Sequence, residues 1–107
     1  MNPFDMMKNL QGLQAKIAET QERLHSTVLE GNAGGGMVKV RMDGTFKIRS
    51  VDIDKSLLNP SDGELIGDLV TAAGNDAHRQ VTELMQREMQ AAAGGLAIPP
   101  ELFGGIR

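Results

Sequence analysis

Between residues 37 and 53 the sequence alternates apolar and polar side chains with a period of two, and no other part of the chain does so. This period is typical of a β-strand with one buried and one solvated face. The flanking segments, residues 1–25 and 61–93, repeat apolar residues every three or four positions, as amphipathic helices do. The chain must therefore fold as one small sheet accompanied by two long helices.

The sheet is predicted to contain three strands, over residues 26–30, 37–42 and 46–53. The first is indicated by a β-branched run that follows the first helical segment. For the second and third strands to share an apolar face, the loop between them must be a three-residue turn over residues 42–44, with Gly44 in a left-handed conformation. That register places Lys39 opposite Lys47. The apolar positions shift after Ile48, which predicts a β-bulge near Arg49 and Ser50.

The glycine run Gly34-Gly35-Gly36 has two possible interpretations. It resembles a phosphate-binding loop, but such loops lead into a helix. This run leads into a strand. A flexible connection between two strands is therefore favoured, and a nucleotide site is not expected.

The ends of both helices carry sequence signals. Pro3 and Asp5 suit the first turn of the first helix. Ser61 and Glu64 match a capping box at the start of the second helix. The first helix also carries a narrow heptad seam, which is about wide enough to pack against one other helix. That helix is either the second helix of this chain or a helix of a partner. The seam consists of Met6, Leu10, Leu13, Ile17 and Leu24.

One face of the predicted sheet is basic, and its role is open at this stage. It carries Lys39, Arg41, Lys47 and Arg49. A solvated face with carboxylates as counter-charges is one interpretation, with Asp52 or Asp54 of this chain or a partner's carboxylates in that role. An anion-binding patch for a phosphate backbone is the other. No aromatic residue for base stacking lies among these cations, which favours the solvated face.

Composition narrows the function further. The 107 residues carry a net charge of −3, contain no cysteine and include two histidines. No spacing typical of a metal site, a nucleophile or a phosphate loop occurs, so we expect no enzyme, cofactor, metal site or small-molecule substrate. No apolar run suits a signal peptide or a membrane span, so a soluble, intracellular protein is expected. A domain this small often completes its core by forming an oligomer.

An ordered series of segments then resembles the bacterial YbaB/EbfC family of nucleoid-associated proteins. It begins with the Met- and Gln-rich helix from Met6 to Gln21 and ends with a Gly-Gly-Leu-Ala-Ile-Pro-Pro sequence at residues 94–100. Between them lie residues 30–40, Asp43-Gly44, residues 51–58 and residues 68–77. Each segment is unspecific by itself, but the order and spacing extend over nearly the whole chain.

The resemblance implies an α+β fold: an α-β-β-β-α protomer with a three-stranded antiparallel sheet and two long helices, and a tweezer-shaped homodimer. It also implies a cytoplasmic, nucleoid-associated protein that binds duplex DNA with little sequence specificity, alters DNA conformation and influences gene expression. The family's DNA contact is attributed to its projecting helices, and a basic residue is shared at Lys39. The second helix here is net acidic, which departs from that pattern. With the sheet cations, the DNA-binding candidates are Lys8, Lys16, Arg23, Lys39, Arg41, Lys47, Arg49, Arg79 and Arg87.

Residues 1–93 are expected to form one α/β domain, and residues 94–107 a tail that contains Gly and Pro. A non-catalytic dimer that recruits protein partners through its helical seam and apolar tail is the alternative function. The net charge of −3 and the lack of stacking aromatics favour that alternative.

Overall fold

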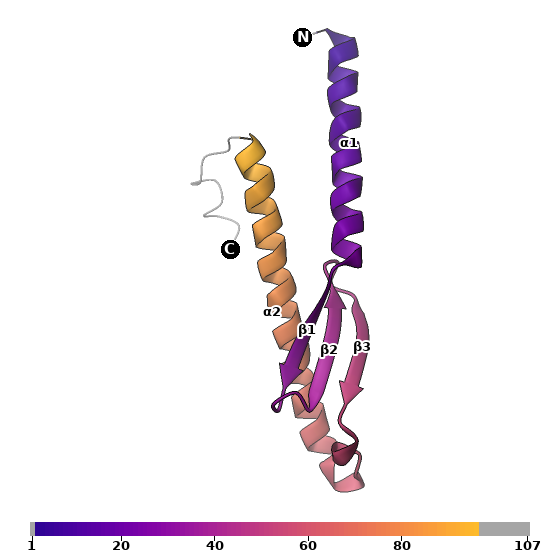
Figure 1. The fold of residues 1–107 in the computed structure, drawn as a ribbon, viewed down its shortest axis with the longest axis vertical. Helices are drawn as coiled ribbons and strands as arrows, with labels where there is room; N and C mark the ends of the chain where they lie inside the picture. Colours follow the sequence, from indigo (N-terminus) through magenta and orange to yellow (C-terminus); the bar gives the residue numbers. More distant parts are fainter. Residues whose placement is uncertain (1, 97–107) are drawn as a thin grey trace.

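A computed structural model describes residues 2–96 of the chain, with side chains described to residue 92. The molecule is elongated, with extents of 69 × 27 × 16 Å. Figure 1 shows a sheet with one helix along its face and a second helix projecting from its end. The predicted α-β-β-β-α order is confirmed. The elements are α1 (Pro3–Ser26), β1 (Val28–Ala33), β2 (Val38–Asp43), β3 (Ile48–Ile53), the short 3₁₀ helices η1 (Lys55–Leu57) and η2 (Pro60–Asp62), and α2 (Gly63–Leu96).

The three strands form an antiparallel sheet in the order β1-β2-β3. Lys39 lies opposite Asp52, so the predicted pairing of Lys39 with Lys47 is wrong. The reason is a longer connection: the Asp43 N–H donates to the Lys47 carbonyl, at 2.8 Å. Within this connection Phe46, and not Gly44, adopts a positive φ, of 66°. The predicted three-residue turn is therefore wrong as well.

Two other predictions for the sheet are confirmed. The β2–β3 register shifts between Arg41 and Met42, whose partners are Ser50 and Ile48, so that Arg49 is the extra residue of a bulge. The glycine run connects β1 to β2, with positive φ values of 63°, 68° and 94° at residues 34–36. Such values are costly for any residue with a Cβ. Its role is thus a turn between strands.

Helix α2 packs against β1 and β2 to form the core. Ala73, Ala77 and Val81 of α2 are fully buried against Val38 and Val40 of β2. Small side chains on both elements allow this close approach. A Cβ atom on Gly31 of β1 would lie only 2.2 Å from the Ala73 carbonyl oxygen. Glycine is therefore required at residue 31 by the closeness of helix and strand, whatever its backbone conformation.

The edge strand β3 is left largely uncovered by α2. Antiparallel partners share a face of the sheet, so Ile48 and Val51 lie on the same face as the buried Met42 and Val40. Yet Ile48 is 59% exposed and Val51 is 43% exposed. We call these two residues the β3 strip. It is an apolar continuation of the core that no described element of this chain covers.

Helix α1 projects away from the sheet and diverges from α2 (Figure 1). All of its residues are described, and among them Leu24 is buried and Thr20 half-buried, while every other one is exposed. The predicted seam is therefore not covered by the second helix of this chain. Asn2 caps the helix by accepting from the Asp5 N–H, at 2.8 Å, and Pro3 occupies the first turn as predicted.

The predicted capping box of α2 is not present. Ser61 lies inside η2, and α2 begins at Gly63. The side-chain amide of Asn59 instead donates to the Ser56 carbonyl and to the Asp62 carboxylate. At its other end α2 continues to Leu96, three residues beyond the predicted end. Residues 97–107 of the predicted tail lie outside the described residues.

Candidate nucleic-acid interface

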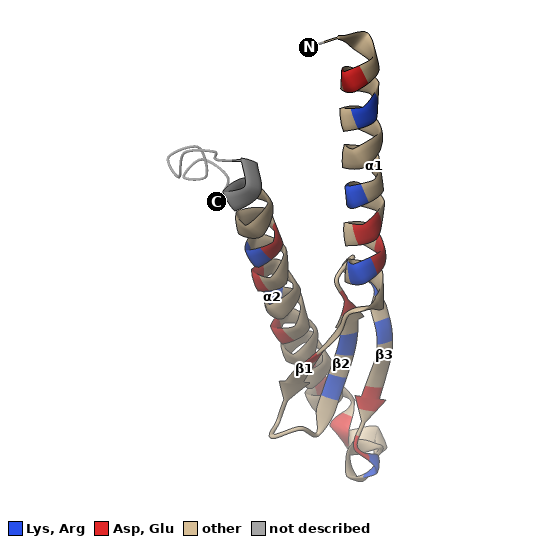
Figure 2. Ribbon diagram, turned by 45° about the horizontal axis from the view of Figure 1, so that its top comes forward, with Lys and Arg blue, Asp and Glu red and all other residues tan. Residues whose placement is uncertain are grey.

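The nine candidate cations lie on α1, β2, α2 and the β2–β3 hairpin, and the structure divides them by their contacts. Figure 2 shows Lys and Arg distributed along α1 and across the sheet, with carboxylates among them. Four of the nine form ion pairs within the chain, and all four are arginines: Arg23, Arg41, Arg49 and Arg79.

Two of these arginines, one on the sheet and one on α2, each pair with two carboxylates. On β2, Arg41 Nη1 lies 2.8 Å from Asp52 Oδ2 of β3, and its Nη2 lies 3.2 Å from Glu30 Oε1 of β1. On α2, Arg79 contacts both Asp76 and Glu83. An arginine with two carboxylate partners presents little positive potential to a phosphate. Asp52 thus supplies the counter-charge that the solvated-face interpretation required.

The remaining five candidates make no ion pair with any carboxylate of the described residues. They are Lys8, Lys16, Lys39, Lys47 and Arg87. We call these five the unpaired cations. Lys8 lies over the Phe4 ring, 5.2 Å from its centroid, near the start of α1. Lys39 is half-buried on β2, whereas the others are exposed. These five keep their charge available for an external anion.

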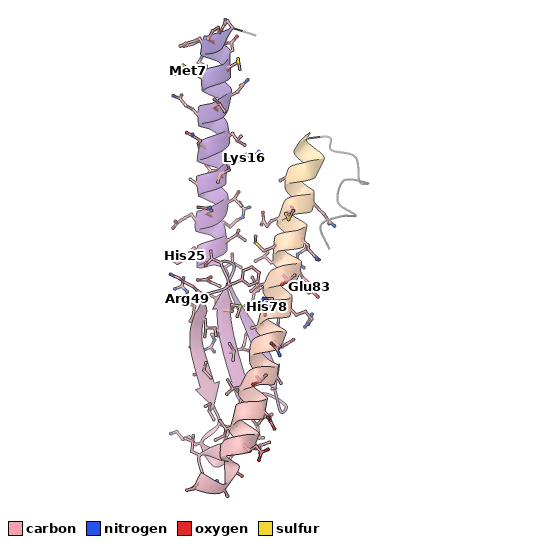
Figure 3. The ribbon with its side chains drawn as sticks, turned by 180° about the vertical axis from the view of Figure 1, so that it is seen from behind. Met7, Lys16, His25, Arg49, His78 and Glu83 are labelled. Carbon is pink, nitrogen blue, oxygen red and sulfur yellow. The ribbon has the colours of Figure 1, made fainter. Side chains whose placement is uncertain are left out.

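A groove of about 470 Å³ separates the C-terminal half of α1 from the end of α2. Lys16 and Ile17 line its α1 side, and Ala91 and Ala92 line its α2 side. The two helices are bridged across it by one ion pair, in which Arg23 Nη2 lies 2.6 Å from Glu88 Oε2. Figure 3 shows Lys16 midway along α1, above the point where the helices converge. The unpaired Lys16 is therefore a cation of the groove, while Arg23 serves to bridge it.

A buried carboxylate lies where α1 meets the hairpin. Asp43 is fully buried. It accepts hydrogen bonds from the hydroxyl and backbone N–H of Thr45, from Arg49 Nε at 2.8 Å, and from the Lys47 N–H. The bonds from Thr45, with those from Arg49 and Lys47, hold the pKa of Asp43 well below its usual range, although burial opposes them. Asp43 is thus a buried carboxylate whose charged form is stabilised by its hydrogen bonds, at the base of α1.

Arg49 extends this network to the end of α1. Its Nη2 donates to the His25 carbonyl at 3.0 Å and lies 3.1 Å from Nε2 of the same residue. Figure 3 shows Arg49 beside His25 at the foot of the helix. Here sequence reasoning placed Arg49 among the DNA contacts and gave Asp43 no role beyond the turn. A signal was present: an Asp two residues before a Thr is a common side-chain-to-backbone turn.

The hairpin also carries an aromatic residue that sequence reasoning did not connect with the cations. Phe46 precedes Lys47 and is 41% exposed, and its ring centroid lies 5.0 Å from that of His78 of α2, with the two rings tilted by 42°. A positive φ at a bulky residue is an outlier that the surrounding structure must stabilise. The contact with His78 is one such stabilising feature, and it ties the hairpin to α2.

Neither a metal site nor a membrane span is found among the described residues. They contain no group of three or more His, Cys, Asp or Glu placed to hold a metal ion. Neither long helix within them has the length and apolar character needed to cross a bilayer.

Comparison with known proteins identifies relatives that cover most of the chain. It is 48% identical over 94 residues to a nucleoid-associated protein of Afipia carboxidovorans, covering 88% of this chain and 90% of the relative. It is 41% identical to a nucleoid-associated protein of Dictyoglomus thermophilum, covering 95% and 98% of the two chains. The crystal structure of an uncharacterized Helicobacter pylori protein, HP0035, has the same fold. That match has a TM-score of 0.74 and 26% identity, and covers 86% of this chain and 97% of the other.

A family model matches residues 1–96, which include every element of the fold and all nine candidate cations. The family is defined by DNA binding and not by catalysis, in agreement with the resemblance noted from the sequence. This chain belongs to the YbaB/EbfC DNA-binding family.

Proposed function

We propose that this protein is a cytoplasmic, nucleoid-associated homodimer that binds duplex DNA with little sequence specificity and alters its conformation, thereby influencing gene expression. The observation that carries the proposal is the division of the candidate cations. Five of the candidate side chains form no ion pair with a carboxylate of the described residues, although the protein as a whole has a net charge of −3. Family membership supplies the ligand, and these five residues supply the phosphate contacts.

The proposed contacts form two groups that can be separated by mutation. The helix group is Lys8 and Lys16 of α1 with Arg87 of α2. The sheet group is Lys39 and Lys47. Both groups are expected to contact mainly phosphates and not base edges, because four of the five residues are Lys, which acts as a point charge without a fixed geometry. Sequence preference is therefore expected to be small.

A salt titration with a fluorescent duplex tests the proposal. In the helix-group variant Lys8, Lys16 and Arg87 become Gln, and in the sheet-group variant Lys39 and Lys47 do. Affinity should fall for every duplex sequence, and the slope of log K against log salt should shrink by about 0.9 for each phosphate that the variant no longer neutralises. Lys55→Gln is the matched control, because it removes an exposed positive charge of η1, beyond the β3 end of the sheet.

The outcomes decide which group acts. If only the helix-group variant weakens binding, the projecting helices carry it, and if only the sheet-group variant does, the sheet carries it. If wild type binds no duplex even at low salt, the proposed function is wrong, and a dimer that recruits protein partners becomes the better account.

The homodimer is supported by the apolar surface that one chain leaves exposed. The β3 strip continues the core onto an uncovered sheet edge, and Leu58 and Leu65 beyond it are 61% and 46% exposed. Edge strands with apolar side chains readily pair with a second copy. Ile48→Gln with Val51→Thr should therefore lower the mass measured by sedimentation from that of a dimer to that of one chain. The neutral pair Gln11→Ser and Gln86→Ser, on exposed helix positions, should leave the mass unchanged.

A further inference from the structure

Helix α1 is attached to the rest of the chain almost entirely through its last turn. Leu24 is its one buried residue, and the main-chain N–H of Gly44 donates to the carbonyls of Leu24 and Thr27 at 2.8 and 3.0 Å. A Cβ on Gly44 would lie 2.6 Å from the Leu24 carbonyl oxygen. The hairpin and the end of α1 are thus in close contact, while the preceding turns of the helix project into solvent.

The direction of a helix held at one end depends on the groups that fix that end. The last carbonyls of a helix lack partners within it and carry the negative end of its dipole. Here the His25 carbonyl accepts from Arg49 Nη2, at 3.0 Å. Arg49 is oriented in turn by Asp43, which accepts from its Nε at 2.8 Å. Its guanidinium group therefore connects the buried carboxylate of the hairpin to the end of the helix.

We propose that Asp43 and Arg49 are positioning residues that set the direction of α1 relative to the sheet, and that Arg49 is not a DNA contact. Its guanidinium group already has the Asp43 carboxylate as its partner. This inference rests on the proposed function only for its consequence for DNA binding. The structural claim stands without it.

Helix α1 is long enough that a small change of direction at its base displaces its far end by several ångströms. Sixteen residues separate Lys8 from Leu24, which is about 24 Å of helix at 1.5 Å per residue. A rotation of about 15° at the base would displace the backbone at Lys8 by about 6 Å. A second connection, Arg23 with Glu88, bridges α1 to α2, but its side chains are 55% and 25% exposed. An ion pair in which both side chains are partly exposed restrains a helix weakly. The junction contains the fully buried carboxylate of Asp43 and the buried side chain of Leu24, so it is expected to dominate.

The first test measures the direction of α1 without DNA. The chain contains no cysteine, so single cysteines at Gln11 of α1 and Gln86 of α2, both exposed, can carry spin labels. Labelled protein is diluted with unlabelled protein so that distances within one chain dominate. Asp43→Asn, Arg49→Gln and Arg49→Lys should each shift or broaden the distance distribution. Asp52→Asn and Arg41→Lys, which alter an exposed pair on the same sheet, should not.

Arg49→Lys is the decisive variant, because it keeps the charge but cannot bridge Asp43 and His25 with a planar fork of donors. As a phosphate contact, Lys at residue 49 would preserve duplex binding. If Arg49 is a positioning residue, the Arg49→Lys substitution should weaken duplex binding about five-fold or more, the scale expected when phosphate contacts of α1 are misplaced. The Arg41→Lys control should bind as wild type does.

For Asp43→Asn, the positioning role and simple electrostatics predict opposite changes in duplex affinity. Removing a carboxylate should strengthen binding to a polyanion if only electrostatics matter, as Asp52→Asn is expected to do slightly. Misdirection of α1 should instead weaken it. Unchanged distances in Arg49→Gln and Arg49→Lys would overturn the inference, as would tighter duplex binding by a folded Asp43→Asn. If wild type fails to bind duplex, the proposed function is wrong, but the distance distributions still decide whether these residues direct α1.

Discussion

Helices α1 and α2 look alike in sequence and differ in how they are held. Both are long and amphipathic, and both carry apolar residues at helical spacing. Yet α2 buries Ala73, Ala77 and Val81 along the sheet, whereas α1 buries Leu24 at its foot and exposes Leu10, Leu13 and Ile17. The difference lies in the small residues. Where Gly31 and two alanines meet, the helix approaches the strand closely, and α1 has no such matched surface in this chain.

The largest expected effect comes from filling the contact between α2 and β1. In Gly31→Ala, the added Cβ would lie 2.2 Å from the Ala73 carbonyl oxygen and 2.4 Å from the Ala77 nitrogen. Because both atoms belong to the backbone, helix and strand must separate. A loss of unfolding free energy of about 3 kcal/mol or more is expected, measured by denaturant titration. A loss below about 1 kcal/mol would show that helix and strand are packed more loosely than these distances require.

A second comparison uses methionine, which occurs both in the core and on the exposed surface of α1. Met42 is 6% exposed in the core, and Met6 is 53% exposed on α1. Met42→Ala should cost about 2–5 kcal/mol of unfolding free energy, as buried large-to-small changes do. Met6→Ala should cost less than about 0.5 kcal/mol. A large, concentration-dependent loss in Met6→Ala would instead place the α1 seam in the interface between two copies.

A pH effect is expected from Asp76, which joins α2 to β1. It accepts from the Asn32 N–H at 3.0 Å and from Arg79 at 2.7 Å. The Asn32 bond first, and then Arg79, hold its pKa below the usual value. Its contribution to stability is therefore present above the unfolded-state pKa of about 3.9 and is lost as pH falls toward the folded-state pKa. In thermal melts between about pH 6 and 2, the melting temperature of Asp76→Asn should fall less steeply with decreasing pH than that of wild type.

Asp68→Asn is the matched control for that series, since Asp68 is an exposed carboxylate of the same helix. Its melting temperature should follow that of wild type across the range. If the melting temperature of Asp76→Asn falls with pH as steeply as that of wild type, the loss of stability in acid comes from other carboxylates, and Asp43 is the first to test.

A small effect of opposite sign is expected when the same substitution, glycine to alanine, is made in α1. A Cβ on Gly12 of α1 meets nothing within 4 Å. Gly12→Ala should therefore raise helix stability by about 0.5–1 kcal/mol through reduced backbone entropy. Stronger helical circular dichroism near the melting temperature would show it. A destabilised Gly12→Ala would mean that another chain packs closely against α1 there.

The element order was predictable because it depends on local periodicity. Period-two alternation identified β2 and β3, helical spacing identified α1 and α2, and the shift of apolar positions after Ile48 identified the bulge. The first strand was placed too early, at residues 26–30 in place of Val28–Ala33. Its glycine at residue 31 is poor in strand propensity and is there for its contact with α2.

The predicted hairpin register was wrong because matching apolar residues across two strands does not reveal a side chain that hydrogen-bonds to the backbone of the turn. Asp43 accepts N–H groups from Thr45 and Lys47, which widens the turn and moves the positive φ to Phe46.

Most of the ion pairs were not predicted, for a related reason. Whether Arg41 meets Asp52 depends on the cross-strand register, and whether Arg23 meets Glu88 depends on how the helices lie, so these pairs could not be read from the sequence. The pairs of Arg79 are different, because Asp76 and Glu83 lie three and four residues away on the same helix.

The central claim is that α1 is an arm held at its foot while α2 belongs to the body. Hydrogen exchange, followed by mass spectrometry on the full chain, tests it most directly. Peptides from residues 5–20 should exchange much faster than peptides from residues 70–82, and added duplex should slow the first set. Equal protection of both sets in the absence of DNA would contradict the account.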